Sequence, residues 1–235
     1  MKKNLLTVLL ILLLGNAAFA QMNGDYNYSI VVNGYSLMQM PKILNQKNAE
    51  RFTNFAFRGG MIKFNDNQIS YRLGGSYLKK DVELANNCVD CQKANGTMTD
   101  YAFKLGFEKN INFSRIQPYF GFDIGFRYNK FDGTLINTND LLSSKAVAYS
   151  SMEPNGVETS KTGFTAAPVI GIKINPVSMI SLFAESNLEM FYSYERQEMV
   201  AADANNTRTL NKYNKMEWLL NPVTVGIQVH LGSIK

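Results

Sequence analysis

The sequence is poor in the residues that most often carry catalysis or hold metals. Its 235 residues include one histidine, His230, and two cysteines, Cys88 and Cys91. A single CxxC spacing, with no second cysteine pair and no histidine in the same loop, offers too few ligands for a zinc site. Acyl chemistry at His230 would also need a nearby nucleophile and an orienting acid, and no spacing in the sequence indicates either.

Long apolar runs are missing as well. Residues 5–14 are apolar apart from one threonine, but a helix that crosses a bilayer needs roughly 20 residues, and no later stretch is apolar enough. Lys2 and Lys3 precede this run, and Ala18-Phe19-Ala20 follows it as a small-x-small cleavage site. Residues 1–20 are therefore predicted to be a cleaved signal peptide for export across the inner membrane. The mature domain is 21–235, and no cysteine follows the cleavage site to take a lipid.

Concentrated charge is the third absence. Without Lys2 and Lys3, 22 of the 24 basic residues remain against 19 acidic ones, a net charge of +3. These charges are scattered singly, whereas nucleic-acid-binding proteins gather theirs in a stripe or patch. The pattern argues against a nucleic-acid partner, and no motif indicates a cofactor.

The feature that is present throughout is alternation with a period of two, which is typical of β-strands. It is clearest in residues 101–128, two strands in which one face is aromatic or apolar and the other is small or charged. The aromatic and apolar face carries Tyr101, Phe103, Leu105, Phe107, Phe120, Phe122, Ile124, Phe126 and Tyr128. Further strands are predicted at 28–38, 52–64, 69–83, 162–174, 180–196 and 212–231, the last with a bulge at Asn221-Pro222.

These eight strands are joined by connections that alternate in length. The long loops are near 39–50, 84–98, 132–160 and 198–211, and the short turns are at 65–67, 112–115 and 175–178. Short periplasmic turns and longer extracellular loops are typical of outer-membrane barrels. The predicted fold is therefore all-β: an eight-stranded antiparallel transmembrane up-and-down β-barrel. The excess length of 180–196 and 212–220 predicts a strand extension that protrudes from the cell surface.

If the aromatic faces meet lipid, the opposite faces line the barrel with five basic and five acidic side chains. They are Arg58, Arg72, Lys104, Arg127 and Lys173 against Asp100, Glu108, Asp123, Glu185 and Glu189. The interior of an eight-stranded barrel is just wide enough for side chains to fill, and buried charges need partners. The balance favours a packed salt-bridge network over an ion or proton path. In an oxidising compartment, Cys88 and Cys91 are predicted to form a small disulfide in the loop near 84–98.

On these patterns the sequence resembles the small outer-membrane β-barrel proteins of the OmpX and OmpA-barrel type, over the whole mature chain. The resemblance implies a location in the outer membrane of a Gram-negative-type cell, contact with lipid and lipopolysaccharide, and insertion by the barrel-assembly machinery. One departure is the C-terminus, Val229 to Lys235, which lacks the terminal aromatic residue of many such barrels.

The expected function is not enzymatic and lies in the extracellular loops, through adhesion to an extracellular or envelope protein partner, envelope integrity or support of secretion. Three alternatives stay open. They are a lipid-modifying barrel enzyme with His230 as base, a narrow ion or solute channel, and a periplasmic lipocalin-like barrel with an apolar inside.

Overall fold

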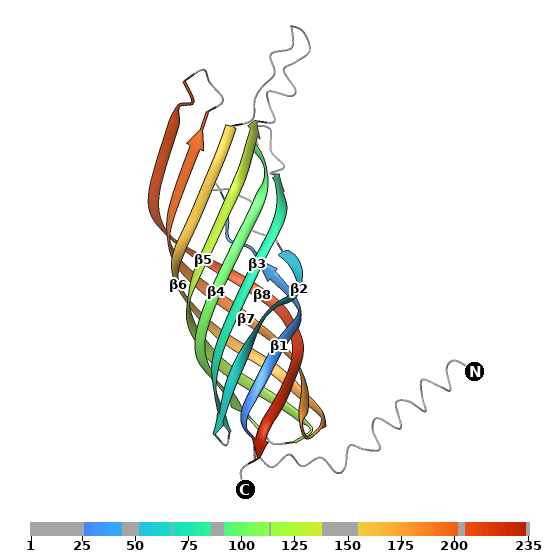
Figure 1. Ribbon diagram of the computed structural model, residues 1–235. Helices are drawn as coiled ribbons and strands as arrows, with labels where there is room; N and C mark the ends of the chain where they lie inside the picture. Colours follow the sequence, from blue (N-terminus) through green and yellow to red (C-terminus); the bar gives the residue numbers. More distant parts are fainter. Residues whose placement is uncertain are drawn as a thin grey trace, which may run out of the picture.

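The computed structural model describes residues 26–43, 52–66, 68–85, 92–112, 114–137, 155–201 and 205–233. Within them the chain forms eight strands that close in sequence order into one barrel (Figure 1). The strands are β1 (Tyr26–Gln39), β2 (Phe52–Asp66), β3 (Ile69–Ala85), β4 (Gln92–Asn110), β5 (Ile116–Asn137), β6 (Asn155–Val177), β7 (Ile180–Val200) and β8 (Arg208–Ser233). In these segments no helix is long and apolar enough to cross a membrane.

Every strand is antiparallel to both neighbours, and β8 pairs with β1 to close the ring. The eight predicted strands are confirmed, and short turns follow β2, β4 and β6, although the last begins only after Val177 because β6 includes most of the predicted turn 175–178. All eight strands are longer than predicted, and the largest differences are that β4 begins at Gln92, β5 runs to Asn137, β6 begins at Asn155 and β7 runs to Val200. Parts of the predicted loops 84–98, 132–160 and 198–211 are therefore strand.

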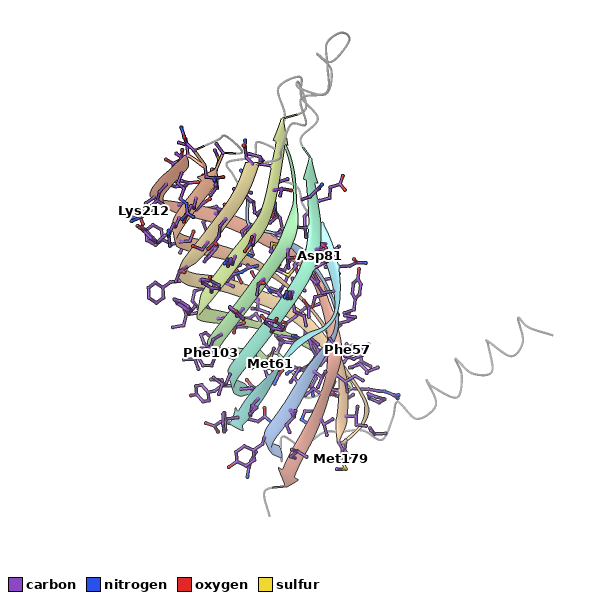
Figure 2. The ribbon with its side chains drawn as sticks, turned by 45° about the horizontal axis from the view of Figure 1, so that its top comes forward. Phe57, Met61, Asp81, Phe103, Met179 and Lys212 are labelled. Atoms are coloured by element: carbon purple, nitrogen blue, oxygen red, sulfur yellow. The ribbon has the colours of Figure 1, made fainter. Side chains whose placement is uncertain are left out.

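The lower part of the barrel, at the end that carries the short turns, is apolar outside and polar inside. Phe103, Leu105 and Ile124 are each about half exposed on the outer wall, whereas Asp100 and Glu108 are fully buried inside. Figure 2 shows the Phe103 and Phe57 side chains directed away from the barrel. We call the outward-facing apolar residues of this lower part the exterior apolar band.

A row of stacked tyrosines lies at the upper edge of the band. Tyr77, Tyr101 and Tyr128 come from β3, β4 and β5, and their neighbouring ring centroids are 5.5 and 5.4 Å apart. Above this row the outward positions become polar: Lys79 on β3, Thr99 on β4 and Lys130 on β5. The upper parts of six strands form what we call the extension, comprising residues 78–85, 92–100, 129–137, 155–163, 195–200 and 208–215.

Over β3, β4 and β5 the inner face of the extension is largely apolar, the reverse of the barrel below, whereas on β6 and β7 it also carries the buried charges of Lys161 and Glu195. A buried cluster of apolar side chains lies there, with Leu78, Val82 and Met199 packed against its margin. Its members are Met38, Met40, Ile43, Phe55, Ala94, Met98, Phe131, Leu135 and Val157. Polarity is therefore largely inverted between the lower and upper parts of β3, β4 and β5.

Two bulges change which face a residue occupies. In β2, Phe57 and Arg58 together oppose Gly34, and Phe57 has a positive φ of 51°. Phe57 therefore points outward, whereas Phe55 and Met61, which a regular alternation places on the same face as Phe57, point inward. In β8 the shift lies at Pro222–Val223, next to the predicted Asn221-Pro222 bulge.

The wall of the barrel is not equally high all round. The ladder between β2 and β3 ends at Gly59 and Ser76, and that between β1 and β8 ends at Leu37 and Val223. In Figure 1, β1 and β2 end well below the tops of β4 to β8. The extension is thus an open sheet of six strands, with β3 and β8 at its two edges.

Candidate functional site

The ten charged residues predicted to line the barrel all lie inside it, and they divide into two clusters. The lower cluster is centred on Glu108, whose side chain is fully buried. One of its oxygens lies 2.8 Å from Lys63 Nζ and 3.4 Å from a nitrogen of Arg72, and the other accepts a hydrogen bond from Lys173. Three cations therefore surround one carboxylate.

Arg72 connects this carboxylate to two more. One of its terminal nitrogens lies 3.3 Å from Asp123 and 3.2 Å from Glu185. Glu185 also accepts a hydrogen bond of 3.0 Å from the hydroxyl of Tyr119. The lower cluster thus contains three basic and three acidic side chains, so its charges balance without a bound ion.

The upper cluster joins Asp100 to Glu189 through Arg127. Arg127 donates to Asp100 over 2.8 Å and to Glu189 over 2.5 Å. Arg58 donates to the other oxygen of Asp100 over 2.7 Å, and Lys104 pairs with Glu189. All five side chains were predicted to be inward, and their pairing is a property of the three-dimensional register.

A third cluster, which the sequence reasoning did not include, lies in the extension. Lys161 is fully buried between Glu217, 2.6 Å away, and Glu195, 3.2 Å away, and Lys215 lies 3.7 Å from both. The interior is therefore charged and paired from the lower barrel into the extension. On the outer surface at this level, a hydrogen bond to Glu158 raises the pKa of Lys130.

Aromatic side chains fill the space between the lower charges. The ring of Tyr119 lies across the barrel floor, with Lys173 Nζ 4.7 Å from its centroid. A Cβ on Gly171 would come within 2.3 Å of this ring, so a larger residue at that position would require the ring of Tyr119 to move. Lys63 Nζ lies within 6 Å of both Tyr119 and Phe183. Side chains thus fill the barrel at this level, as expected for eight strands.

The turn end of the barrel is closed by a chain of polar side chains that crosses six strands. Ser70 donates to Asn65, Asn65 donates to Ser29, and Ser29 contacts His230 Nδ1 at 3.0 Å. His230 Nε2 lies 2.6 Å from Ser181, which donates to Asn175. Because each hydroxyl has one proton, these directions fit a neutral His230 that carries its proton on Nε2.

This chain also places two serine hydroxyls against the only histidine, which no spacing in the sequence indicated. Ser29 and Ser181 are both fully buried, and His230 is nearly so. Ser29 is directly opposite His230 in the ladder between β1 and β8. The Ser29 contact therefore crosses the seam where the barrel closes, the Ser181 contact joins β8 to β7, and neither of these two hydroxyls is exposed to a substrate.

Removing the imidazole is expected to weaken this closure. In His230→Ala, Ser29 and Ser181 lose their shared partner in a buried place, which costs about 1–3 kcal/mol. Urea unfolding of the refolded barrel measures the change as a lower midpoint. Ser114→Ala, in an exposed turn at the same end, is the control and should leave the midpoint unchanged. An unchanged midpoint for His230→Ala would show that the seam does not depend on this chain.

Two of the sequence predictions fall outside the described residues. Cys88 and Cys91 lie between β3 and β4 in the undescribed segment 86–91, so the disulfide stays a prediction. The signal peptide at 1–20 is likewise outside the described part.

The arrangement defines the class: a closed eight-stranded antiparallel barrel with an apolar exterior, a paired interior and an extended rim. Two solved structures with a similar fold are outer-membrane proteins. OprG from Pseudomonas aeruginosa has a TM-score of 0.51 at 9% identity, over 90% of this chain and 99% of that one. A major outer membrane protein from Thermus thermophilus also has a TM-score of 0.51, at 10% identity, over 87% and 99%. No protein-family profile and no curated sequence matches the chain. At these identities the likeness shows the fold.

Proposed function

We propose that this protein is an integral outer-membrane β-barrel that holds its extension outside the cell. The observation that carries the proposal is the inversion of polarity at the tyrosine row. Below Tyr77, Tyr101 and Tyr128 the outside is apolar and the inside is ionic, which suits lipid. Above them, on the same three strands, the outside is polar and the inside is largely apolar, which suits water. Both termini of the described barrel lie at the turn end, which is the periplasmic side in this placement.

The partners proposed for the barrel itself follow from this placement. The exterior apolar band contacts the lipid chains and the lipopolysaccharide of the outer leaflet. Insertion depends on the barrel-assembly machinery. No nucleic acid takes part, because the surface charges of both signs are interspersed.

We further propose that the barrel neither conducts nor catalyses. The lower cluster and Tyr119 fill its cross-section, which supports a plugged interior. The burial of Ser29 and Ser181 supports a structural role for His230. The function then belongs to the extension, in binding an extracellular or envelope protein.

The edge of the extension at β8 is the surface that fits such a partner. No described strand pairs with β8 above Val223 on the side away from β7. The backbone N–H of Leu220 points to this side, since it donates to the side chain of Gln39. Strand backbones alternate, so Met216, Asn214 and Lys212 present their N–H and C=O groups to the same side. An unpaired edge of this kind pairs with an extended segment of another protein.

A proline on this edge tests the proposal. Asn214→Pro removes an N–H that does not bond to β7, so the barrel should fold while strand addition is blocked. Asn214→Ala changes the same side chain but keeps the N–H and is the matched control. The probe is a fluorescent strand-forming peptide of alternating threonine and valine, measured by anisotropy with the protein in lipid nanodiscs. We expect binding by the parent and Asn214→Ala, and about tenfold weaker binding by Asn214→Pro. Equal binding by the two variants would contradict the edge as the binding surface.

A further inference from the structure

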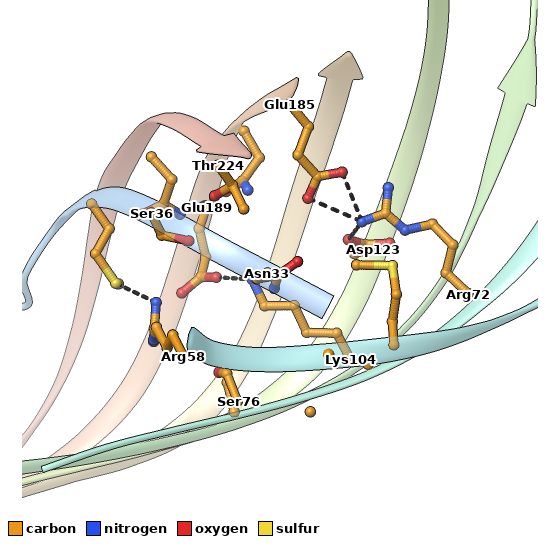
Figure 3. A pocket seen from close by; sticks show the side chains of 18 residues that line it. Asn33, Ser36, Arg58, Arg72, Ser76, Lys104, Asp123, Glu185, Glu189 and Thr224 are labelled. Carbon is orange, nitrogen blue, oxygen red and sulfur yellow. Dashed lines mark hydrogen bonds and ion pairs between the residues drawn. The ribbon is translucent and has the colours of Figure 1, made fainter. Parts of the chain in front are cut away.

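A cavity of about 90 Å³ separates the lower and upper clusters inside the barrel (Figure 3). Arg72, Asp123 and Glu185 of the lower cluster line one side of it, and Arg58, Lys104 and Glu189 line the other. Three basic and three acidic side chains therefore face one space. The cavity lies beside the place where the ladder between β2 and β3 ends.

Polar atoms without a protein partner collect around this cavity. In the described part of the chain, five lining residues each have one buried polar atom that makes no hydrogen bond with protein. They are Asn33 Oδ1, Arg58 Nε, Arg72 Nε, Asp123 Oδ1 and Asn221 Oδ1. Each such atom destabilises the fold by about 1–3 kcal/mol if nothing satisfies it. Because the residues that carry these five atoms all line one space, a ligand in that space accounts for them together.

The kinds of atom identify the ligand. Two of the five are N–H donors and three are acceptors, so the ligand both donates and accepts. A lone cation would be repelled by Arg58 and Arg72, and a lone anion by Asp123 and Glu185. A water molecule needs two to four polar partners and occupies about 30 Å³ in the liquid, so a space of about 90 Å³ accommodates about three.

We propose that this cavity is a binding site for a cluster of ordered water molecules, which bridges the two ion-pair clusters. The water supplies hydrogen bonds that the barrel wall cannot reach. It joins the lower and upper clusters into one continuous network, and it lets their six charged side chains remain ionised within the barrel. This site is independent of the edge proposed for partner binding.

Two variants of equal size at Ala102 test the proposal. Ala102 lines the cavity and is nearly buried, and valine or threonine there would occupy the same volume. Valine displaces water without replacing its hydrogen bonds, whereas threonine displaces the same water and supplies a hydroxyl. We expect Ala102→Val to have an unfolding equilibrium constant roughly tenfold above that of Ala102→Thr. Urea unfolding of both variants in the same lipid measures this ratio.

A dry cavity gives the opposite order, because filling an empty space with methyl groups stabilises a protein. Ala102→Val as stable as Ala102→Thr, or more stable, would therefore overturn the proposal. The unaltered protein provides a second measurement that does not depend on how the variants fold. A crystal structure at a resolution that shows ordered water should place water oxygens within about 3.2 Å of Arg58 Nε and Asp123 Oδ1. A cavity without water, or one closed by rearranged side chains, would also overturn it.

Discussion

Replacing Glu108 with alanine is expected to lower the free energy of unfolding by about 3–5 kcal/mol, the cost of breaking a buried ion pair by removing one partner. The carboxylate is fully buried and, among the described residues, is the one acidic group that pairs with all of Lys63, Arg72 and Lys173. Its loss leaves three buried cations facing one another. Lys63 and Lys173 are affected most, because their other hydrogen bonds are to the neutral side chains of Gln228 and Asn110.

Glu158→Ala is the matched control for this measurement. Glu158 also pairs with a lysine, Lys130, at 3.1 Å, but both side chains are well exposed on the extension. Exposed pairs contribute only about 0–1 kcal/mol. Both variants can be refolded into lipid vesicles and unfolded in urea, with folding followed by the gel mobility of unheated and heated samples. A change below about 1 kcal/mol for Glu108→Ala would contradict the central place given to this carboxylate.

The sequence was sufficient to predict which side chains point inward and outward where strands are regular and one face is strongly aromatic. In β4 and β5 each inward and outward assignment from Tyr101 to Phe107 and from Phe120 to Tyr128 is confirmed. Two-residue alternation fixes these faces, because a shift of one residue would move every aromatic side chain to the inside. The eight strands, their antiparallel order and the short turns follow from the same pattern.

The β2 bulge and the inverted inner face of the extension were the features that the pattern did not predict. At the bulge Phe57 points outward, although Phe55, Met61 and Lys63, which share its alternation, point inward. In the extension, Ala94 and Met98 point inward between polar neighbours, so the stretch has the composition of a loop. If the same face of a strand is expected to be apolar along its whole length, the predicted strand ends before the extension begins.

The candidate site was predicted as a set of residues but not as a set of pairs. Arg127 bonds to both Asp100 and Glu189, which are 27 positions and 62 positions away in sequence. Such pairs depend on the stagger of the strands around the barrel. This stagger cannot be predicted from the residue types alone. The cluster around Lys161 was missed for a related reason, because Glu217 joins it from a strand beyond the bulge at Pro222–Val223.

Replacing Ile124 with arginine is expected to show whether the outer wall of the barrel at this position faces lipid or water. Ile124 is 56% exposed near the middle of the exterior apolar band on β5. Arginine on the lipid face destabilises an outer-membrane barrel by about 2–4 kcal/mol at the bilayer midplane and by about 0–1 kcal/mol near the interfaces. Ile124→Arg should therefore lose about 2–4 kcal/mol in the free energy of unfolding from vesicles.

Thr134→Arg is the matched control, because Thr134 lies ten positions further along β5, faces the same side and belongs to the extension. It should unfold within about 0.5 kcal/mol of the parent, as surface substitutions usually do. In a water-soluble barrel the order would be reversed, since an arginine at Ile124 would cover exposed apolar surface with charge. Equal stability of Ile124→Arg and Thr134→Arg, together with recovery in the soluble fraction, would mean that the exterior apolar band does not contact lipid. A loss confined to Ile124→Arg would place the membrane boundary between these two residues, where the tyrosine row lies.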